Sequence, residues 1–351
     1  MAHQIESMMY LGATPWHSLG TKLNNPPTAR EAIIAAGLNW EVATKAIRTV
    51  DGEALAHKAT YRVSDGRILG VVGPHHKPYQ NAEAFAWFDP FLAAGQARFE
   101  TAGSLAGGRK VWILAKLSRD PAEIVKGDTV EKYILLSNAH DGSMAIRVGF
   151  TPIRVVCANT LAMAVSDKGS KLLRVRHTKN VADVMLKVRD IMNAADAAFE
   201  ATAEQYRALA RCAINSADLA KYVRLVFPKV LKDSDSDAID TTAETTAEPA
   251  DGAAGLVGLL DREIGDHSGV SVAERQSKAA AEVTRLFEEG KGHDLPGVRG
   301  TMWAAFNGVA EYVTHHRGRD DERRLAAQFS DGAALTKHAL TTALAFAAAK
   351  A

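Results

Sequence analysis

A dense group of cations lies between Arg147 and Lys179. Seven Lys or Arg side chains fall in this stretch, against a single acid. In the run Leu172-Leu173-Arg174-Val175-Arg176-His177 a cation recurs at every second position, so a β-strand would project Arg174 and Arg176 from the same face. Such a face suits a polyanion, because each phosphate that it neutralises releases condensed counterions. The alternative is a solvated face that binds no ligand.

The charge of the chain is divided unevenly along its length. Residues 1–180 carry 22 Lys or Arg against 15 Asp or Glu, whereas the whole chain has 42 against 41. The front half is therefore basic and the back half is acidic. This distribution assigns any nucleic-acid surface to the front half.

A nucleic-acid surface would draw on two sets of cations. The first set comes from the dense group, and the second extends the track along earlier predicted strands. The first set is Arg147, Arg154, Arg174, Arg176 and Lys179, and the second is Lys45, Arg48, Lys58 and Arg62. Tyr61 and Tyr79, each close to a cation in the sequence, would supply aromatic faces for stacked bases.

Hairpins are the elements predicted to carry these cations. The pairs Asp65-Gly66, Gly107-Gly108 and Asp141-Gly142 are turn signals, and alternating runs flank them. We also expect a strand at residues 40–50 and another at 171–178. Residues 1–27, with three prolines, are expected to form an irregular arm.

Helices are predicted between the hairpins and throughout the back half. Thr28 is a capping residue for a helix that ends at Gly37, and Asn81 begins a second helix. Residues 158–166 are predicted to form a short helix. Residues 180–227 have helical spacing and form one long helix, or two that join near residues 212–216. Further helices are expected at residues 271–289, 298–316 and from 321 onward.

The predicted fold class is α+β, with a βββα-like antiparallel core in the front half and a helical back half. Residues 233–251 contain seven acids and no base, a composition that cannot bury enough surface to order itself. We therefore divide the chain into a basic α+β core (1–180), a helical segment (181–232), an acidic disordered linker (233–256) and a helical C-terminal region (257–351).

The two cysteines, Cys157 and Cys212, lie in apolar or helical contexts without the spacing of a zinc site or disulfide framework. The N-terminal residues lack the pattern of a signal peptide, and no apolar run approaches the length of a membrane span. We therefore expect a cytoplasmic protein with no membrane partner.

No cofactor or metal site is predicted. Residues 103–110 contain glycines and a lysine, but not in the order that a phosphate-binding loop requires. A two-strand turn explains them better, and ATP use is not expected. The pairs His75-His76 and His315-His316 lack carboxylates at ligand spacing, so a metal centre is not expected there.

An enzyme is the main alternative to nucleic-acid binding. A hydrolase-like site of unknown substrate would use polar side chains of the front half for nucleophilic or acid–base chemistry. Its candidate residues are His17, His140, Asp141, Cys157, Asn159 and His177. Because Cys157 follows an apolar strand, a buried small side chain explains it more simply, and no catalytic residue is assigned.

Four motifs connect the chain with a known family. The segments PWHSLG, VVCANTL, RVRHT and GTMWAAFNGVAEYVTHHRG resemble the bacterial phage/plasmid-like protein family known by a domain of unknown function. The resemblance extends from about Met8 to His338, apart from the acidic linker. It implies a phage or plasmid setting but no established reaction.

The order of hairpins and helices in the front half also resembles the βββα core of Rad fifty-two-type single-strand annealing proteins. That resemblance implies ATP-independent binding and annealing of single-stranded DNA in a basic groove, by a ring or other homo-oligomer. A single-strand-binding protein is a further partner that this interpretation allows. A third interpretation is a protein-binding inhibitor of host defence.

Overall fold

The computed structural model describes residues 5–12, 20–118, 120–154, 159–160, 173–178, 180–193, 196–227, 272–317 and 331–350. Within these ranges antiparallel-rich sheets come from the front half and helices dominate the back half, which confirms the predicted α+β class. No helix in the same ranges combines the length and the apolar character needed to cross a membrane.

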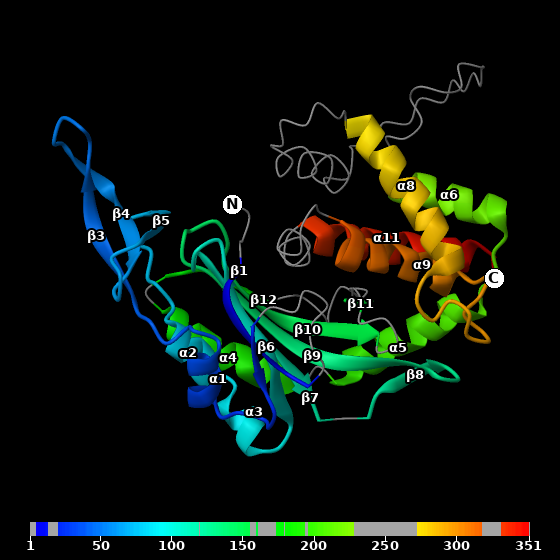
Figure 1. Cartoon of the computed structure of the whole chain (residues 1–351), viewed down its shortest axis with the longest axis horizontal. Coiled ribbons are helices and arrows are strands. Elements are labelled where there is room, and N and C mark those ends of the chain that lie inside the picture. The colour runs from blue at the N-terminus through cyan, green and yellow to red at the C-terminus, as the bar shows by residue number, and fades with distance from the viewer. Residues whose placement is uncertain are drawn as a thin grey trace.

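A large sheet forms the centre of the molecule (Figure 1). Its strands follow the order β11-β10-β9-β7-β6-β1-β2, while β8 pairs with β9 and β12 pairs with β10. Every pairing is antiparallel except that of β1 with β2. The strands are β1 (Ile5–Leu11), β2 (Thr21–Leu23), β6 (Ala97–Leu105), β7 (Lys110–Leu117), β8 (Ala122–Val125), β9 (Asp128–Ala139), β10 (Ile146–Arg154), β11 (Asn159–Thr160) and β12 (Leu173–Val175).

The predicted irregular arm at residues 1–27 is wrong for the part that the structure describes. Residues 5–11 form β1, which pairs with β6 inside the large sheet. The reason is the apolar run from Met8 to Leu11, whose four side chains are all buried. Burial of this run stabilises the strand, although no turn signal in the sequence marks its ends.

Four helices cover one face of the large sheet: α1 (Ala29–Ala35), α2 (Asn81–Ala86), α3 (Asp89–Ala93) and α4 (Val181–Asn193). They and the sheet share one apolar core, which includes Phe85, Phe88, Phe99, Ile113 and Ile134. The start of α1 is fixed as predicted, because Thr28 and Glu31 form a reciprocal capping box.

A second, three-stranded sheet stands out from the large one at the upper left of Figure 1. It consists of β3 (Val42–Arg48), β4 (Ala54–Arg62) and β5 (Ile68–Val72), in that order. We call residues 42–72 the β-arm. Gly66 turns the chain between β4 and β5 with a positive φ of 73°, a backbone conformation that glycine adopts without strain. Gly142 does the same between β9 and β10.

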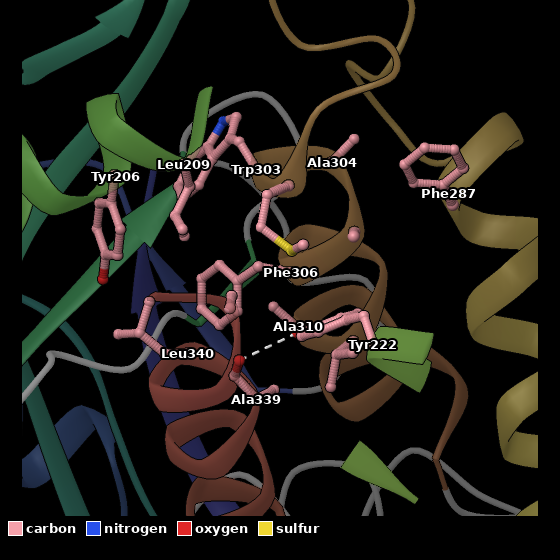
Figure 2. Close-up of a cluster of buried hydrophobic side chains, with 14 of the residues drawn as sticks. Tyr206, Leu209, Tyr222, Phe287, Trp303, Ala304, Phe306, Ala310, Ala339 and Leu340 are labelled. Carbon is pink, nitrogen blue, oxygen red and sulfur yellow. Dashed lines mark hydrogen bonds between the residues drawn. The ribbon is translucent and has the colours of Figure 1, made fainter. Parts of the chain in front are cut away.

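The helical half packs around α9 (Met302–Glu311), every residue of which is buried. The surrounding helices are α5 (Asp196–Arg211), α6 (Ser216–Val226), α8 (Val272–Glu289), η2 (Tyr312–His316) and α11 (Asp331–Lys350). Figure 2 shows Trp303 and Phe306 of α9 among side chains from these helices. The Tyr222 hydroxyl, itself buried, donates to the Ala339 carbonyl at 3.1 Å.

The predicted helical segment at residues 180–227 consists of α4, α5 and α6. The break between α5 and α6 falls at residues 212–215, where the sequence predicted a join. Asn215 caps α6 through a reciprocal capping box with Asp218. The predicted helix at 158–166 lies mostly outside the described residues, although Asn159 and Thr160 form β11 and not a helix. The acidic linker also lies outside them.

A buried ion pair connects the large sheet to the helical half. Arg154 of β10 donates to both carboxylate oxygens of Asp128 on β9, with Nε–Oδ1 at 2.8 Å and Nη2–Oδ2 at 2.7 Å. Both side chains are fully buried. The Trp303 indole donates to the same carboxylate at 2.8 Å, and Arg154 also donates to the carbonyls of Lys291 and Gly292. The Arg154–Asp128 pair thus connects β9 and β10 to α9 and to the loop after α8.

This arrangement predicts a large loss of stability when only the cation is removed. Arg154→Met should lower the free energy of unfolding by about 3–5 kcal/mol, because it leaves the Asp128 carboxylate buried without its partner. The matched control is Arg211→Met, which breaks an exposed pair with Glu204 and should cost less than about 1 kcal/mol. Urea unfolding measures both values, and equal losses would contradict a structural role for the Arg154 pair.

Candidate functional site

A cleft of about 590 Å³ opens where the β-arm joins the body of the protein. One wall comes from the arm and the other from the loop between β5 and α2, with one residue from the segment after β12. The lining residues are Val42, Ala43, Thr44, Lys58, Pro74, His75, His76, Lys77, Pro78 and Thr178. A volume of this size falls within the range of small-molecule pockets and would hold one nucleotide or a few residues of an extended chain.

The lining of the cleft is basic. It contains Lys58, Lys77 and two histidines, and no Asp or Glu is among the lining residues. Lys77 and His75 are exposed, whereas Lys58 is half-buried. Low-dielectric walls with charges of one sign concentrate counterions, so this lining favours an anionic ligand.

Three histidines pack together beneath the cleft. The His76 ring stacks on the His177 ring with centroids 4.6 Å apart, and both rings are near enough to the fully buried His140 to lower its pKa. The main chain of Lys77 holds His177 on two sides: the Lys77 N–H donates to the His177 carbonyl at 3.1 Å, and the His177 Nδ1 lies 3.2 Å from the Lys77 carbonyl. We call His76, His140 and His177 the histidine junction.

Hydrogen bonds indicate which ring nitrogen carries the proton at two of these histidines. The Nδ1 of His177 faces a carbonyl, which can only accept, so it is the protonated nitrogen. The Nε2 of His140 faces the Asn81 Oδ1 at 3.0 Å. The Asn81 amide nitrogen donates to the Leu38 carbonyl, which leaves Oδ1 as an acceptor for the His140 N–H. The other nitrogens, Nε2 of His177 and Nδ1 of His140, then present buried lone pairs.

Burial keeps the junction uncharged near neutral pH. Desolvation, and then the nearby His177, lower the pKa of His76 to about 4. Desolvation, and then the nearby His177, His76 and Arg62, lower the pKa of His140 to about 3. Desolvation also lowers the pKa of His177, although the nearby main-chain carbonyls of Lys77 and Met144 oppose this shift.

The junction also docks the β-arm on the body. The Thr60 hydroxyl of β4 donates to the His140 carbonyl at 2.7 Å. Gly70 of β5 lies so close to the main chain of Asp141 that a Cβ atom at this position would clash at 2.5 Å. The buried Asn138 donates to the Tyr79 carbonyl at 3.0 Å. The cleft, the junction and the base of the arm are therefore one structural unit.

Among the described residues, no group of three His, Cys, Asp or Glu side chains is arranged to hold a metal ion. The adjacent His75 and His76 differ in surroundings: His75 is exposed, whereas His76 is half-buried against His177. The two rings therefore do not form a pair of metal ligands.

The four cations that the sequence assigned to the earlier strands do not form one track. In the register of β3 and β4, Lys45 lies opposite Ala59 and Ala46 lies opposite Lys58, so Lys45 and Lys58 project from opposite faces. The exposed Lys45 lies 5.0 Å from the centre of the Tyr61 ring. Arg48 is exposed and donates to the Gly52 carbonyl within its own hairpin turn.

The sequence predicted that Arg62 lies on a surface that binds nucleic acid, but its side chain does not face solvent. Its side chain is buried, donates to Glu6 at 2.6 Å and to the Gly107 carbonyl at 3.1 Å, and stacks on Trp40. These contacts hold the β-arm against β1 and the turn between β6 and β7. Because the guanidinium is already paired inside the protein, Arg62 is removed from the set of phosphate contacts.

Arg154 is removed from that set for the same reason, since a phosphate cannot reach a fully buried guanidinium that is paired with Asp128. Elsewhere in the dense group, Arg174 of β12 lies opposite Arg147 of β10 in the sheet register. Arg147 is half-buried, and Arg176 is exposed. The side chain of Arg174 and the whole of Lys179 lie outside the described part of the structure.

The structure brings together two residues of the predicted enzyme site, His140 and His177. Asp141 follows His140 directly and is half-buried in the turn. His17, Cys157 and the side chain of Asn159 lie outside the described residues. Sequence reasoning missed Gln80, Asn81 and Asn138 as neighbours of the site, because nothing in their local sequence shows which distant carbonyl or amide they bond.

The fold and the cleft define an α+β protein in which a β-arm and a body of mixed secondary structure share a basic cleft. A family model described as "Domain of unknown function (DUF932)" matches residues 68–252 and 259–335, which is more than half of the chain. The protein therefore belongs to the DUF932 family. No curated protein matches the chain, and no solved structure matches it.

The neutral histidine junction predicts a dependence of stability on pH. Below the ordinary histidine pKa of about 6.5 the unfolded chain binds protons that the folded junction does not, so the folded state loses stability as the pH falls. Replacing His140 with Gln should remove about one proton from the pH slope of the unfolding free energy between pH 6 and 4.

Urea unfolding at a series of pH values measures this slope. The exposed His57→Gln is the control and should keep the wild-type slope. His76→Gln, at a half-buried position, repeats the test if His140→Gln does not fold. Slopes that match the wild type in both junction variants would show that these histidines take up protons in the folded state.

Proposed function

We propose that this protein binds single-stranded nucleic acid without ATP, with the basic cleft at the base of the β-arm as its main contact. The observation that carries the proposal is a lining that combines Lys58, Lys77 and His75 with no acid among its members. Lysines at the mouth of a cleft neutralise phosphates, and the His75 and proline faces offer surfaces on which bases stack.

The outer face of the β-arm extends the proposed contact. Lys45 lies over the Tyr61 ring, a cation beside an aromatic face of the kind that single-strand-binding surfaces use. Arg48 and Arg176 are exposed cations outside the cleft. The revised set of proposed contacts is Lys45, Arg48, Lys58, Lys77 and Arg176, together with the half-buried Arg147.

Strand annealing, a ring or other homo-oligomer and a phage or plasmid setting belong to the same proposal. Their support comes from the basic front half of the sequence and from motif resemblance. An annealing protein needs cations and stacking faces along a strand but no phosphate-binding loop for ATP, and none is found in the sequence.

A hydrolase-like enzyme is the second candidate, favoured by the proximity of His140, His177 and His76. In the described structure each of the three rings has one buried nitrogen without a hydrogen-bond partner, which could take part in proton transfer. Only His76 also lines the cleft, so a substrate bound there would meet His76 first. Turnover of a nucleic-acid strand by the purified protein would favour this candidate, and intact strands would favour simple binding.

The proposed contact predicts a specific effect on salt-dependent binding. Lys58→Ala with Lys77→Ala should weaken binding of a single-stranded oligonucleotide and reduce the log–log salt slope by about 1.4, which is about 0.7 per lost phosphate contact. The matched control is Lys126→Ala with Lys337→Ala, which removes two exposed lysines outside the cleft lining, one between β8 and β9 and one in α11. Fluorescence anisotropy at several salt concentrations measures both quantities.

Two results would count against the proposal. Wild-type protein that does not bind the oligonucleotide at low salt would exclude nucleic-acid binding. Equal losses in the two double variants would indicate a diffuse response to net charge and no contact at the cleft.

A further inference from the structure

Among the described residues, no strand pairs with the outer edge of β3 along the cleft. β3 pairs only with β4 in the described structure. The Val63 N–H donates to the Glu41 carbonyl at 2.9 Å, which fixes the residues of β3 whose main chain faces β4. Because the main-chain groups of successive residues point alternately to the two sides of a strand, Ala43 and Lys45 face β4. Val42, Thr44 and Ala46 then face away from it.

One of these three outward residues already has a strand-like partner. The Val42 N–H donates to the Gln80 Oε1 at 2.9 Å, and the Gln80 Nε2 donates to the Val42 carbonyl at 2.9 Å. A single side-chain amide thus makes both hydrogen bonds that one residue of a neighbouring strand would make. It shows that the outward N–H and carbonyl of Val42 are positioned to bond a neighbouring group along this edge.

The next outward residues, Thr44 and Ala46, have no such partner. No hydrogen bond within the described part of the chain involves their outward N–H and carbonyl groups. The strand has no proline to prevent further pairing. Its features that protect an edge are the exposed Lys45 and a register shift between Ala46 and Arg48, and both come after Thr44. Thr44 itself lines the cleft, so a bound chain would meet this edge.

We propose that the β3 edge binds an extended acidic segment of a partner protein, which adds to the β-arm as a fourth strand. Main-chain hydrogen bonds to Thr44 and Ala46 would hold the segment. Its acidic side chains would face Lys58 and Lys77, whose charges no acid of the cleft lining offsets. The chemistry of the ligand is therefore a peptide in β-conformation with Asp or Glu at alternate positions.

The edge fits a peptide better than a nucleic-acid strand. Thr44 and Ala46 each present one donor and one acceptor, and the two residues are about 7 Å apart along the strand. A peptide strand repeats donors and acceptors at the same spacing, whereas a phosphodiester backbone has no N–H group to donate to the Thr44 carbonyl. The proposal goes beyond nucleic-acid binding, and the two ligands would compete because both meet Lys58 and Lys77.

Proline at position 44 tests the edge without a change of charge. Thr44→Pro removes the outward N–H, a change that edge strands accept because that group makes no bond within the sheet. The control Thr44→Val keeps the N–H and removes only the hydroxyl. The probe is a blocked, fluorescein-labelled peptide in which Glu alternates with Thr and Val, and its binding is followed by anisotropy.

We expect Thr44→Pro to weaken peptide binding about tenfold or more while Thr44→Val binds as the wild type. Binding of a single-stranded oligonucleotide should be the same in both variants, because no charge has changed. A peptide with N-methyl groups on the paired edge should bind poorly to the wild-type protein. If Thr44→Pro does not fold, amide exchange on the wild type replaces it, and the peptide should protect the amides of Thr44 and Ala46.

Three outcomes would overturn the proposal: no binding of the acidic peptide, equal binding by Thr44→Pro and Thr44→Val, or no protection of the two amides. Failure of nucleic-acid binding is seen separately, in the oligonucleotide titration of the same protein. If the protein binds the peptide but not the oligonucleotide, peptide binding at the β3 edge remains as the function of the cleft.

Discussion

The ion pair of Arg154 and Asp128 is the contact on which the union of the two halves depends. The carboxylate sits at the start of β9 and the guanidinium at the end of β10, and the two side chains are fully buried. Trp303 adds a hydrogen bond from the centre of the helical half, and the loop after α8 adds two carbonyls. Because separation of the two halves would take the Trp303 indole and the two carbonyls away from this buried charged pair, it would be costly.

A second polar connection at the other end of β9 fixes the β-arm. It uses neutral groups: the histidine junction, Asn81 and Asn138, and the Thr60 hydroxyl that bonds the His140 carbonyl. Arg62 adds the one buried charge, paired with Glu6. Since these contacts fix the arm at its base, they also determine the shape of the cleft between the arm and residues 74–78. The three histidines therefore help to shape the cleft but add no charge to it near neutral pH.

The sequence predicted the elements whose signals are local. Glycine turns at Gly66 and Gly142, the cap at Thr28 and the break before α6 all depend on residues within a few positions of one another. The first strand was missed because it has no turn signal and is stabilised by burial inside the sheet. The fold class could therefore be predicted from pattern alone, while the position of β1 could not.

The site was harder to predict, because burial of a cation depends on distant partners. Arg154 and Arg176 look alike in the sequence, yet one is enclosed by Asp128 and Trp303 and the other is exposed. The cleft draws on residues from 42 to 178, and the strand register that separates Lys45 from Lys58 is set by hairpin pairing. Lys77 and His75 lie in no binding motif of the sequence, so only the structure shows that they line the same cleft.

The central claim is that the cleft at the base of the β-arm is where this protein meets an anionic strand. Photo-crosslinking a single-stranded oligonucleotide that carries photoreactive bases, followed by mass spectrometry of the peptides, tests this claim most directly. We predict adducts in residues 42–48 and 74–78, with few in the helical half. Adducts confined to residues 196–227 and 272–350 would contradict the claim.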